Sequence, residues 1–151
     1  MSHVSNPGAI AAMPRQDAMR ALLAGIGADL QAYAELQVLL RDQFRAALRH
    51  KASELAAAAE AIETQVDAMQ QRRAERVALV QRLVGETGNM AQAFALLKST
   101  AREKMEADWA SLEQAVIECK RLSKRNGDLL AEQYTIMQRV LHGEEQIYAP
   151  A

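Results

Sequence analysis

Residues 105–119 read MEADWASLEQAVIEC, and their apolar positions indicate the type of fold. They recur at alternating steps of four and three residues: Met105, Trp109, Leu112, Val116 and Cys119. This spacing puts all of them on one stripe of an α-helix, because residues three and four apart share a helix face. The stretch therefore predicts a long amphipathic helix that packs its apolar stripe against other helices.

The stripe becomes polar at Ser123 and Asn126, and Gly127 follows directly. A glycine in a helix interior costs about 1 kcal/mol relative to alanine, so the Asn126-Gly127 pair weakens the helix locally. One interpretation is a kink or a close crossing with a neighbouring helix. The other is that the pair lowers helix stability so that the following segment can detach or change shape around a partner.

Apolar residues resume after this pair and spread over more than one helix face: Leu129, Leu130, Tyr134, Ile136, Met137, Val140 and Leu141. A helix with such a wide apolar surface must either be enclosed by other helices or present apolar area to a partner. We interpret it as a surface that receives a partner helix. The candidate contact residues are Asn126, Gly127, Leu129, Leu130, Ile136, Met137, Val140 and Leu141.

Two further long helices are predicted before this one. Residues 1–14 are expected to be disordered and to be closed off by Pro14, after which the first helix spans about residues 15–40. No Gly or Pro marks the end of this helix. Asp42 is a suitable N-cap for the second helix, which places the predicted turn at Leu40 to Gln43.

A short helix is predicted between the second and third long helices. Gly85 and Gly88 end the second helix, and Asn89 or Thr87 caps the short helix that carries Met90, Phe94 and Leu97. The third long helix is expected to run from about residue 102 to 141. Gly143 is its predicted stop, and residues 143–151 are the predicted flexible tail.

Composition supports an all-α protein. Half of the 151 residues are apolar, but only 4% are aromatic, which is typical of long helices and not of β-sandwiches or α/β folds. The predicted architecture is an elongated antiparallel three-helix bundle or coiled coil, with a short additional helix between the second and third long helices. Residues 15–142 form this bundle as one domain.

Charge and cysteine content exclude several classes of protein. The formal net charge is −1, so no overall field attracts nucleic acid or an anionic membrane. Cys119 is the single cysteine, which excludes an internal disulfide, and its place on the apolar stripe predicts a small buried side chain. The chain lacks both a membrane span of roughly 18 to 20 apolar residues and a secretory signal at its start. We expect a cytoplasmic protein that does not insert into membranes.

No pattern of catalytic residues is present. His3, His50 and His142 are far apart in the sequence and have no neighbouring ligand at metal-site spacing, and there is no Gly-rich phosphate loop. We therefore expect neither an enzyme nor a bound cofactor or metal. The basic residues Arg72, Arg73 and Arg76 are interpreted as a solvated helix face, with an acidic protein partner as the alternative.

Several short motifs follow one another in order: Trp109, the run NGDLL at residues 126–130, the pair Val140-Leu141, and Tyr148 shortly after Gly143. Lys51 lies earlier, in the run RHKASEL at residues 49–55. By the order and spacing of these motifs the chain resembles the FlgN family of flagellar export chaperones, over roughly residues 16–148.

The resemblance implies a cytosolic type III flagellar export chaperone. Its clients would be hook-associated junction proteins of the FlgK and FlgL type, bound through their C-terminal helices so that premature assembly is prevented. It further implies delivery to the cytoplasmic domain of the flagellar export gate, with Tyr148 as the matching contact residue. The alternative is a structural coiled-coil protein whose apolar helix face self-associates; the same face allows a weak homodimer in either case.

Overall fold

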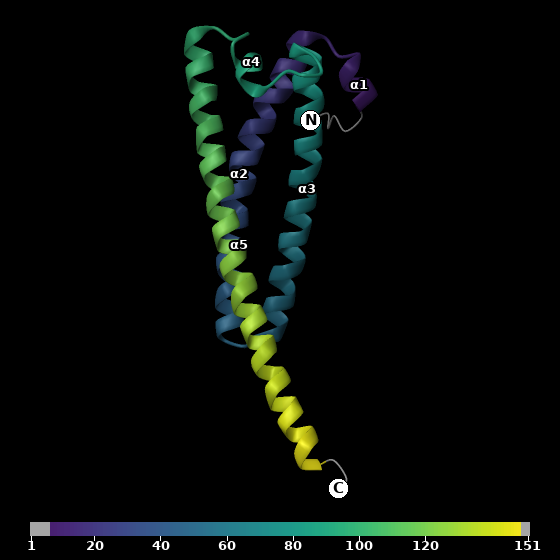
Figure 1. The fold of residues 1–151 in the computed structure, drawn as a ribbon. Helices are drawn as coiled ribbons and strands as arrows, with labels where there is room; N and C mark the ends of the chain where they lie inside the picture. Colours follow the sequence, from purple (N-terminus) through teal and green to yellow (C-terminus); the bar gives the residue numbers. More distant parts are fainter. Residues whose placement is uncertain (1–6, 149–151) are drawn as a thin grey trace.

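The computed structural model describes the backbone of residues 7–148 and the side chains of residues 8–143. It consists of five helices, shown in Figure 1: α1 (Pro7–Ala11), α2 (Arg15–Leu48), α3 (Ala52–Val84), α4 (Met90–Phe94) and α5 (Ser99–Tyr148). Helix α2 packs against both α3 and α5, and α4 bridges α3 and α5 at one end of the bundle. The predicted elongated three-helix bundle with a short additional helix is confirmed.

The turn between the first two long helices lies later than predicted, at Arg49 to Lys51. Helix α2 continues through Asp42, whose carboxylate accepts a hydrogen bond from Arg45 Nη1 at 3.2 Å instead of capping a new helix. His50 ends α2 in the left-handed conformation, with φ 54°. Its N–H donates to the Ala47 carbonyl at 3.2 Å, and the Lys51 N–H donates to the Ala46 carbonyl at 3.0 Å.

These two bonds form a Schellman motif, the usual way to satisfy the last carbonyls of a helix. Glycine normally fills the left-handed position, but histidine is enriched there among the other residues. The predicted turn at Leu40 to Gln43 is therefore wrong, because the real helix end lacks the Gly or Pro that would mark it. Lys51 is the N-cap residue of α3.

The link from α3 to α5 follows the prediction. Gly85, with φ 95°, ends α3 in a backbone conformation that glycine adopts without strain. Asn89 caps α4: its Oδ1 accepts the Gln92 N–H at 2.9 Å, and its own N–H donates to Gln92 Oε1 at 3.0 Å. This reciprocal pair is a capping box and satisfies two backbone donors at the helix start.

Two end segments differ from the prediction. Residues 7–11 form α1 rather than a disordered segment, and Ile10 is buried against Leu22 and Leu83; residues 1–6 lie outside the described part. At the other end α5 passes through Gly143 and reaches Tyr148, so the predicted helix stop is wrong. Glycine lowers helix stability by about 1 kcal/mol but does not prevent a helix.

The core consists of three clusters along the bundle. One joins α1, α2 and α3 around Leu22 and Leu79, the next packs Ile26 against Phe94 and Met105, and the third lies around Leu36, Leu40, Met69, Cys119 and Leu122. The predicted burial of Cys119 is confirmed: its Sγ lies 3.7 Å from the Tyr33 carbonyl, and burial raises the pKa of the thiol. Cys119 is thus a packed side chain of the α2–α5 contact.

Candidate functional site

Helix α5 extends beyond the other helices. Its upper part runs beside α2, whereas its last part passes the α2–α3 turn and projects from the bundle (Figure 1). Gln133 marks the limit of the contact, because its Nε2 donates to the carbonyl of Ala47 at 2.9 Å, one residue before the end of α2. The residues after Gln133 therefore have no second long helix opposite them.

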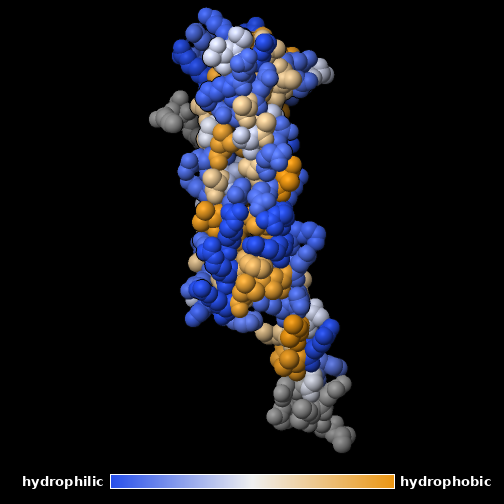
Figure 2. Space-filling model, turned by 90° about the vertical axis from the view of Figure 1, so that its left-hand side faces the viewer, coloured by the Kyte–Doolittle hydropathy of each residue, from blue (hydrophilic) through white to orange (hydrophobic). Residues whose placement is uncertain are grey.

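The face of α5 that packs on α2 continues into this projecting part. Leu122 and Asn126 are buried on that face, and the sequence continues at steps of three and four residues through Gln133 to Met137 and Val140. Beyond Gln133 the apolar side chains on this side and on the adjacent flank are about half exposed or more: Tyr134, Ile136, Met137, Val140 and Leu141. Figure 2 shows hydrophobic side chains gathered on the projecting end, next to the grey residues.

These side chains line an open hollow of about 490 Å³ in the corner between α5 and the α2–α3 turn. His50 contributes from the turn, and the other lining residues come from α5: Gln133, Tyr134, Ile136, Met137, Gln138, Val140 and Leu141. None of them is a carboxylate, and the polar groups present are amides, a phenol and an imidazole. The hollow thus suits apolar side chains of another helix rather than a charged small molecule.

Asn126 does not belong to this open surface. Its side chain is 3% exposed, and its amide nitrogen donates to the Leu40 carbonyl at 2.7 Å and to Gln43 Oε1 at 2.8 Å. Its amide oxygen accepts from Arg125 Nη2 at 3.3 Å, while the Arg125 guanidinium lies over the Phe44 ring, 3.7 Å from the centroid. Asn126 therefore holds α5 in register on α2, which supports a helix contact over detachment at this position.

Gly127 has a different environment from Asn126. It is exposed within the helix, and a Cβ atom added to it would meet no atom within 4 Å. It lies three residues before Leu130 and seven before Tyr134, so it is on the same flank of α5 as these two. No close approach of another helix requires the glycine.

The structure thus divides the eight predicted contact residues. Asn126 is buried against α2, Gly127 lies on an exposed flank, and Leu129 and Leu130 are half-buried at the edge of the bundle. The remaining four come together in the hollow: Ile136, Met137, Val140 and Leu141. Sequence reasoning missed His50 and Gln133, because both depend on where the α2 turn falls. Tyr148 is the last residue of α5, and its side chain lies outside the described residues.

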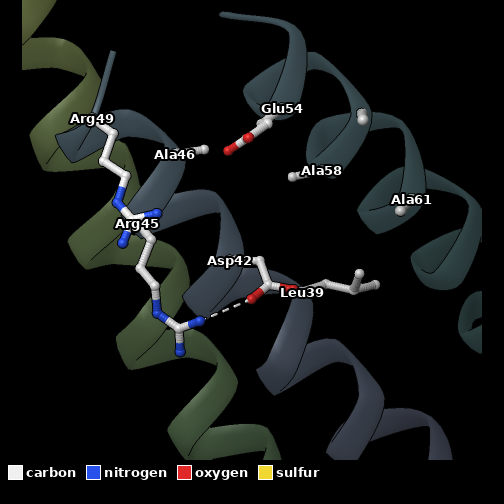
Figure 3. A pocket seen from close by; sticks show the side chains of 9 residues that line it. Leu39, Asp42, Arg45, Ala46, Arg49, Glu54, Ala58 and Ala61 are labelled. Carbon is white, nitrogen blue, oxygen red and sulfur yellow. Dashed lines mark hydrogen bonds and ion pairs between the residues drawn. The ribbon is translucent and has the colours of Figure 1, made fainter. Parts of the chain in front are cut away.

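A second hollow, of about 470 Å³, lies between α2 and α3 near the same turn (Figure 3). Its α3 wall consists of three alanines, Ala57, Ala58 and Ala61, together with Glu54. Its α2 wall carries Asp42 hydrogen-bonded to Arg45, together with Arg49. Alanine leaves this space because it does not reach across to α2. The lining therefore mixes opposite charges with short alanines and does not form a continuous apolar face.

Within the described side chains, no group of three or more His, Cys, Asp and Glu is placed to hold a metal ion. No helix in the described part has a stretch that is long and apolar enough to cross a membrane.

Comparison with known protein families gives a match over most of the chain. The family model described as FlgN protein matches residues 13–143. This range includes the whole bundle from the start of α2 and the exposed face of α5 up to Gly143. No curated protein and no solved structure matches the chain.

Proposed function

Because the chain belongs to the FlgN family of flagellar export chaperones, we propose that the projecting part of α5 binds the helical C-terminus of a hook-associated junction protein. The clients are of the FlgK and FlgL type, and the complex forms in the cytoplasm. Covering the client helix prevents premature assembly. The chaperone then delivers the client to the cytoplasmic domain of the flagellar export gate.

One observation carries this proposal: the α2-facing side of α5 continues past the end of α2, and within the described residues no other helix covers it there. Ile136, Met137 and Val140 are 50%, 60% and 59% exposed there. A client helix in the hollow would take the place that α2 has higher up the bundle. Full burial of an apolar side chain of this size contributes roughly 1.5–3 kcal/mol. Covering the exposed part of these side chains therefore contributes favourably to the free energy of client binding.

The test is Ile136→Glu together with Val140→Glu in the full chain. We expect binding of an isolated FlgK-type C-terminal helix, measured by calorimetry, to weaken at least about a hundredfold, because both carboxylates would be buried without partners. Helix content by circular dichroism should stay the same, since both residues project into solvent. The matched control is Val38→Glu with Ile117→Glu, which changes two exposed apolar residues on the bundle itself. Equal binding by the site variant and the control would place the client elsewhere.

Delivery to the export gate is assigned to Tyr148. A tyrosine combines a rigid apolar ring with a hydroxyl, and this combination is common in docking contacts. We expect Tyr148→Ala to retain client binding and thermal stability but to reduce binding of the chaperone–client complex to the gate domain. Tyr148→Phe is the control that separates the ring from the hydroxyl. Unchanged gate binding by Tyr148→Ala would refute this role.

Self-association is the alternative use of the same face, because a second copy would cover the same residues. Light scattering on the free chain separates the two uses. A monomer that forms a one-to-one complex with the client supports the chaperone. A tight dimer that remains intact in the presence of every junction protein supports the structural role.

A further inference from the structure

Met137 has surroundings that differ from those of the other methionines. Those within residues 8–143 belong to the core clusters or pack against them: Met13, Met19, Met69, Met90 and Met105. Met69 and Met105 are only 8% and 7% exposed, whereas Met137 is 60% exposed. Among the methionines whose side chains are described, Met137 is therefore the one whose sulfur is readily reached from solvent.

Met137 lies within the open hollow of the projecting part of α5. Its neighbours three and four residues away along the helix are Gln133, Tyr134, Val140 and Leu141, and all four line the same hollow of about 490 Å³. A client helix that fills this hollow therefore covers the Met137 side chain. The most accessible methionine of the described part thus lies at the centre of the proposed client surface.

A methionine thioether reacts with hydrogen peroxide without help from neighbouring groups, because a lone pair on sulfur attacks one peroxide oxygen. The O–O bond breaks, an S–O bond forms, and the second oxygen leaves with both protons as water. Sulfur is oxidised by two electrons and peroxide is reduced. The product, methionine sulfoxide, is polar, and methionine sulfoxide reductases convert it back to the thioether.

A sulfoxide at this position opposes the docking of an apolar helix. Its oxygen is a hydrogen-bond acceptor that water solvates in the free chain, so oxidation should leave the bundle intact. A client that covers it with apolar side chains removes this water and supplies no donor. The Gln133 amide nitrogen, four residues earlier, already donates to the Ala47 carbonyl at 2.9 Å.

We propose that Met137 is a reversible oxidation site at which peroxide switches off client binding. The proposal rests on the proposed function, since the client is the same helix. Binding and oxidation oppose each other, because a bound client shields the sulfur and the sulfoxide weakens the client. Peroxide therefore acts on the empty chaperone and spares chaperone that already holds a client.

The first test measures where the chain is oxidised. The free chain is treated with dilute hydrogen peroxide, and each methionine is followed by peptide mass spectrometry. We expect Met137 to oxidise first, and Met69 and Met105 to react at least about tenfold more slowly because they are buried. An excess of a methionine-free FlgK-type C-terminal helix should slow the oxidation of Met137 and leave the rates at Met69 and Met105 unchanged.

The second test measures client binding by calorimetry, with the same methionine-free helix. The oxidised chain should bind about tenfold more weakly than the untreated chain, because the sulfoxide oxygen loses its water in the complex. Treatment with methionine sulfoxide reductases that act on both sulfoxide epimers should restore the affinity. Helix content by circular dichroism should be the same in all three samples.

Three variants assign the effect to one sulfur. Met137→Leu keeps an apolar side chain of similar size, so it should bind the client and keep its affinity after peroxide. Met137→Gln carries a polar group without oxidation and should bind weakly from the start. Met19→Leu removes a half-buried methionine of α2 that does not line the hollow, and its client binding should remain sensitive to peroxide.

Several results would overturn the proposal. Equal loss of affinity in Met137→Leu and the unchanged chain after peroxide would place the responsible sulfur elsewhere. Equal affinity of the oxidised and the untreated chain would mean that Tyr134, His50 or Gln138 solvates the sulfoxide in the complex. A helix that does not bind even the untreated chain would refute the client site itself, and the switch with it.

Discussion

Leu122 and Val140 occupy the same side of α5, yet Leu122 is completely buried and Val140 is 59% exposed. The two residues belong to one continuous pattern of apolar steps, and the difference between them lies in another part of the chain. Helix α2 stands opposite Leu122 and ends at Leu48, before it reaches the level of Val140. An amphipathic stripe therefore predicts that a helix face is buried. The length of the neighbouring helix determines whether it is buried within the chain or by a partner.

The comparison predicts that shortening the side chain lowers the free energy of unfolding strongly at one position and hardly at all at the other. Leu122→Ala should lower the free energy of unfolding by about 3 kcal/mol, because it leaves a cavity between α2 and α5. Val140→Ala should change the free energy of unfolding by less than about 0.5 kcal/mol, since it removes no internal contact. Urea titrations followed by circular dichroism measure both values.

The effects of the two substitutions on client binding should be the reverse of their effects on stability. Val140→Ala should then weaken client binding, while Leu122→Ala should affect it only through the stability of the fold. A Val140→Ala chain that is destabilised as much as Leu122→Ala would mean that the projecting part of α5 folds back onto the bundle. The comparison between the two parts of α5 would then fail.

Asn126 and Gln133 allow a second comparison, between a buried and a marginal polar contact with α2. Asn126→Ala should lower the free energy of unfolding by roughly 1–3 kcal/mol, because it leaves Gln43 and Arg125 without their buried partner. Gln133→Ala loses one half-buried bond to the Ala47 carbonyl and should cost about 0.5–1.5 kcal/mol. Chemical denaturation of both variants gives the two values.

Asn126→Leu tests the role of the Asn126 amide more directly, because it places an apolar residue in the same stripe. If this variant is more stable than the unchanged chain, the amide serves register and not stability. If both Asn126 variants unfold like the unchanged chain, the bonds from Asn126 to α2 are not formed in solution.

Much of the fold follows from local sequence patterns. The stripe from Met105 to Cys119 predicts α5, and Gly85 with Asn89 predicts the link around α4, because each signal acts within a few residues. The turn at His50 was missed since its Schellman motif is made by backbone groups around a residue that is not glycine. The continuation of α5 past Gly143 was missed because glycine weakens a helix without ending it.

The candidate site likewise has a part that could be predicted from the sequence and a part that could not. The apolar residues from Ile136 to Leu141 could be found from composition and spacing, because exposure of a wide apolar face follows from the helix pattern itself. The burial of Asn126 could not, because its partners Leu40 and Gln43 lie more than eighty residues earlier and are set by the register of two helices. The three arginines at residues 72–76 of α3 likewise look alike in the sequence, and Asp29 of α2 makes the difference between them by pairing with two of the three.

Gly127 gives the smallest expected effect and tests the junction between the two parts of α5. Gly127→Ala should raise the free energy of unfolding by up to about 1 kcal/mol, since the backbone is helical and an added Cβ meets no atom within 4 Å. Amide hydrogen exchange across residues 128–141 should slow in the variant, because alanine reduces fraying from the junction outward. Gly143→Ala is the matched control: it also adds a Cβ in open space, but its effect on exchange should be confined to the last turns of α5. Faster exchange in Gly127→Ala would show that Gly127 holds a backbone shape that alanine cannot adopt, and the two parts of α5 would then be joined by a hinge instead of a continuous helix.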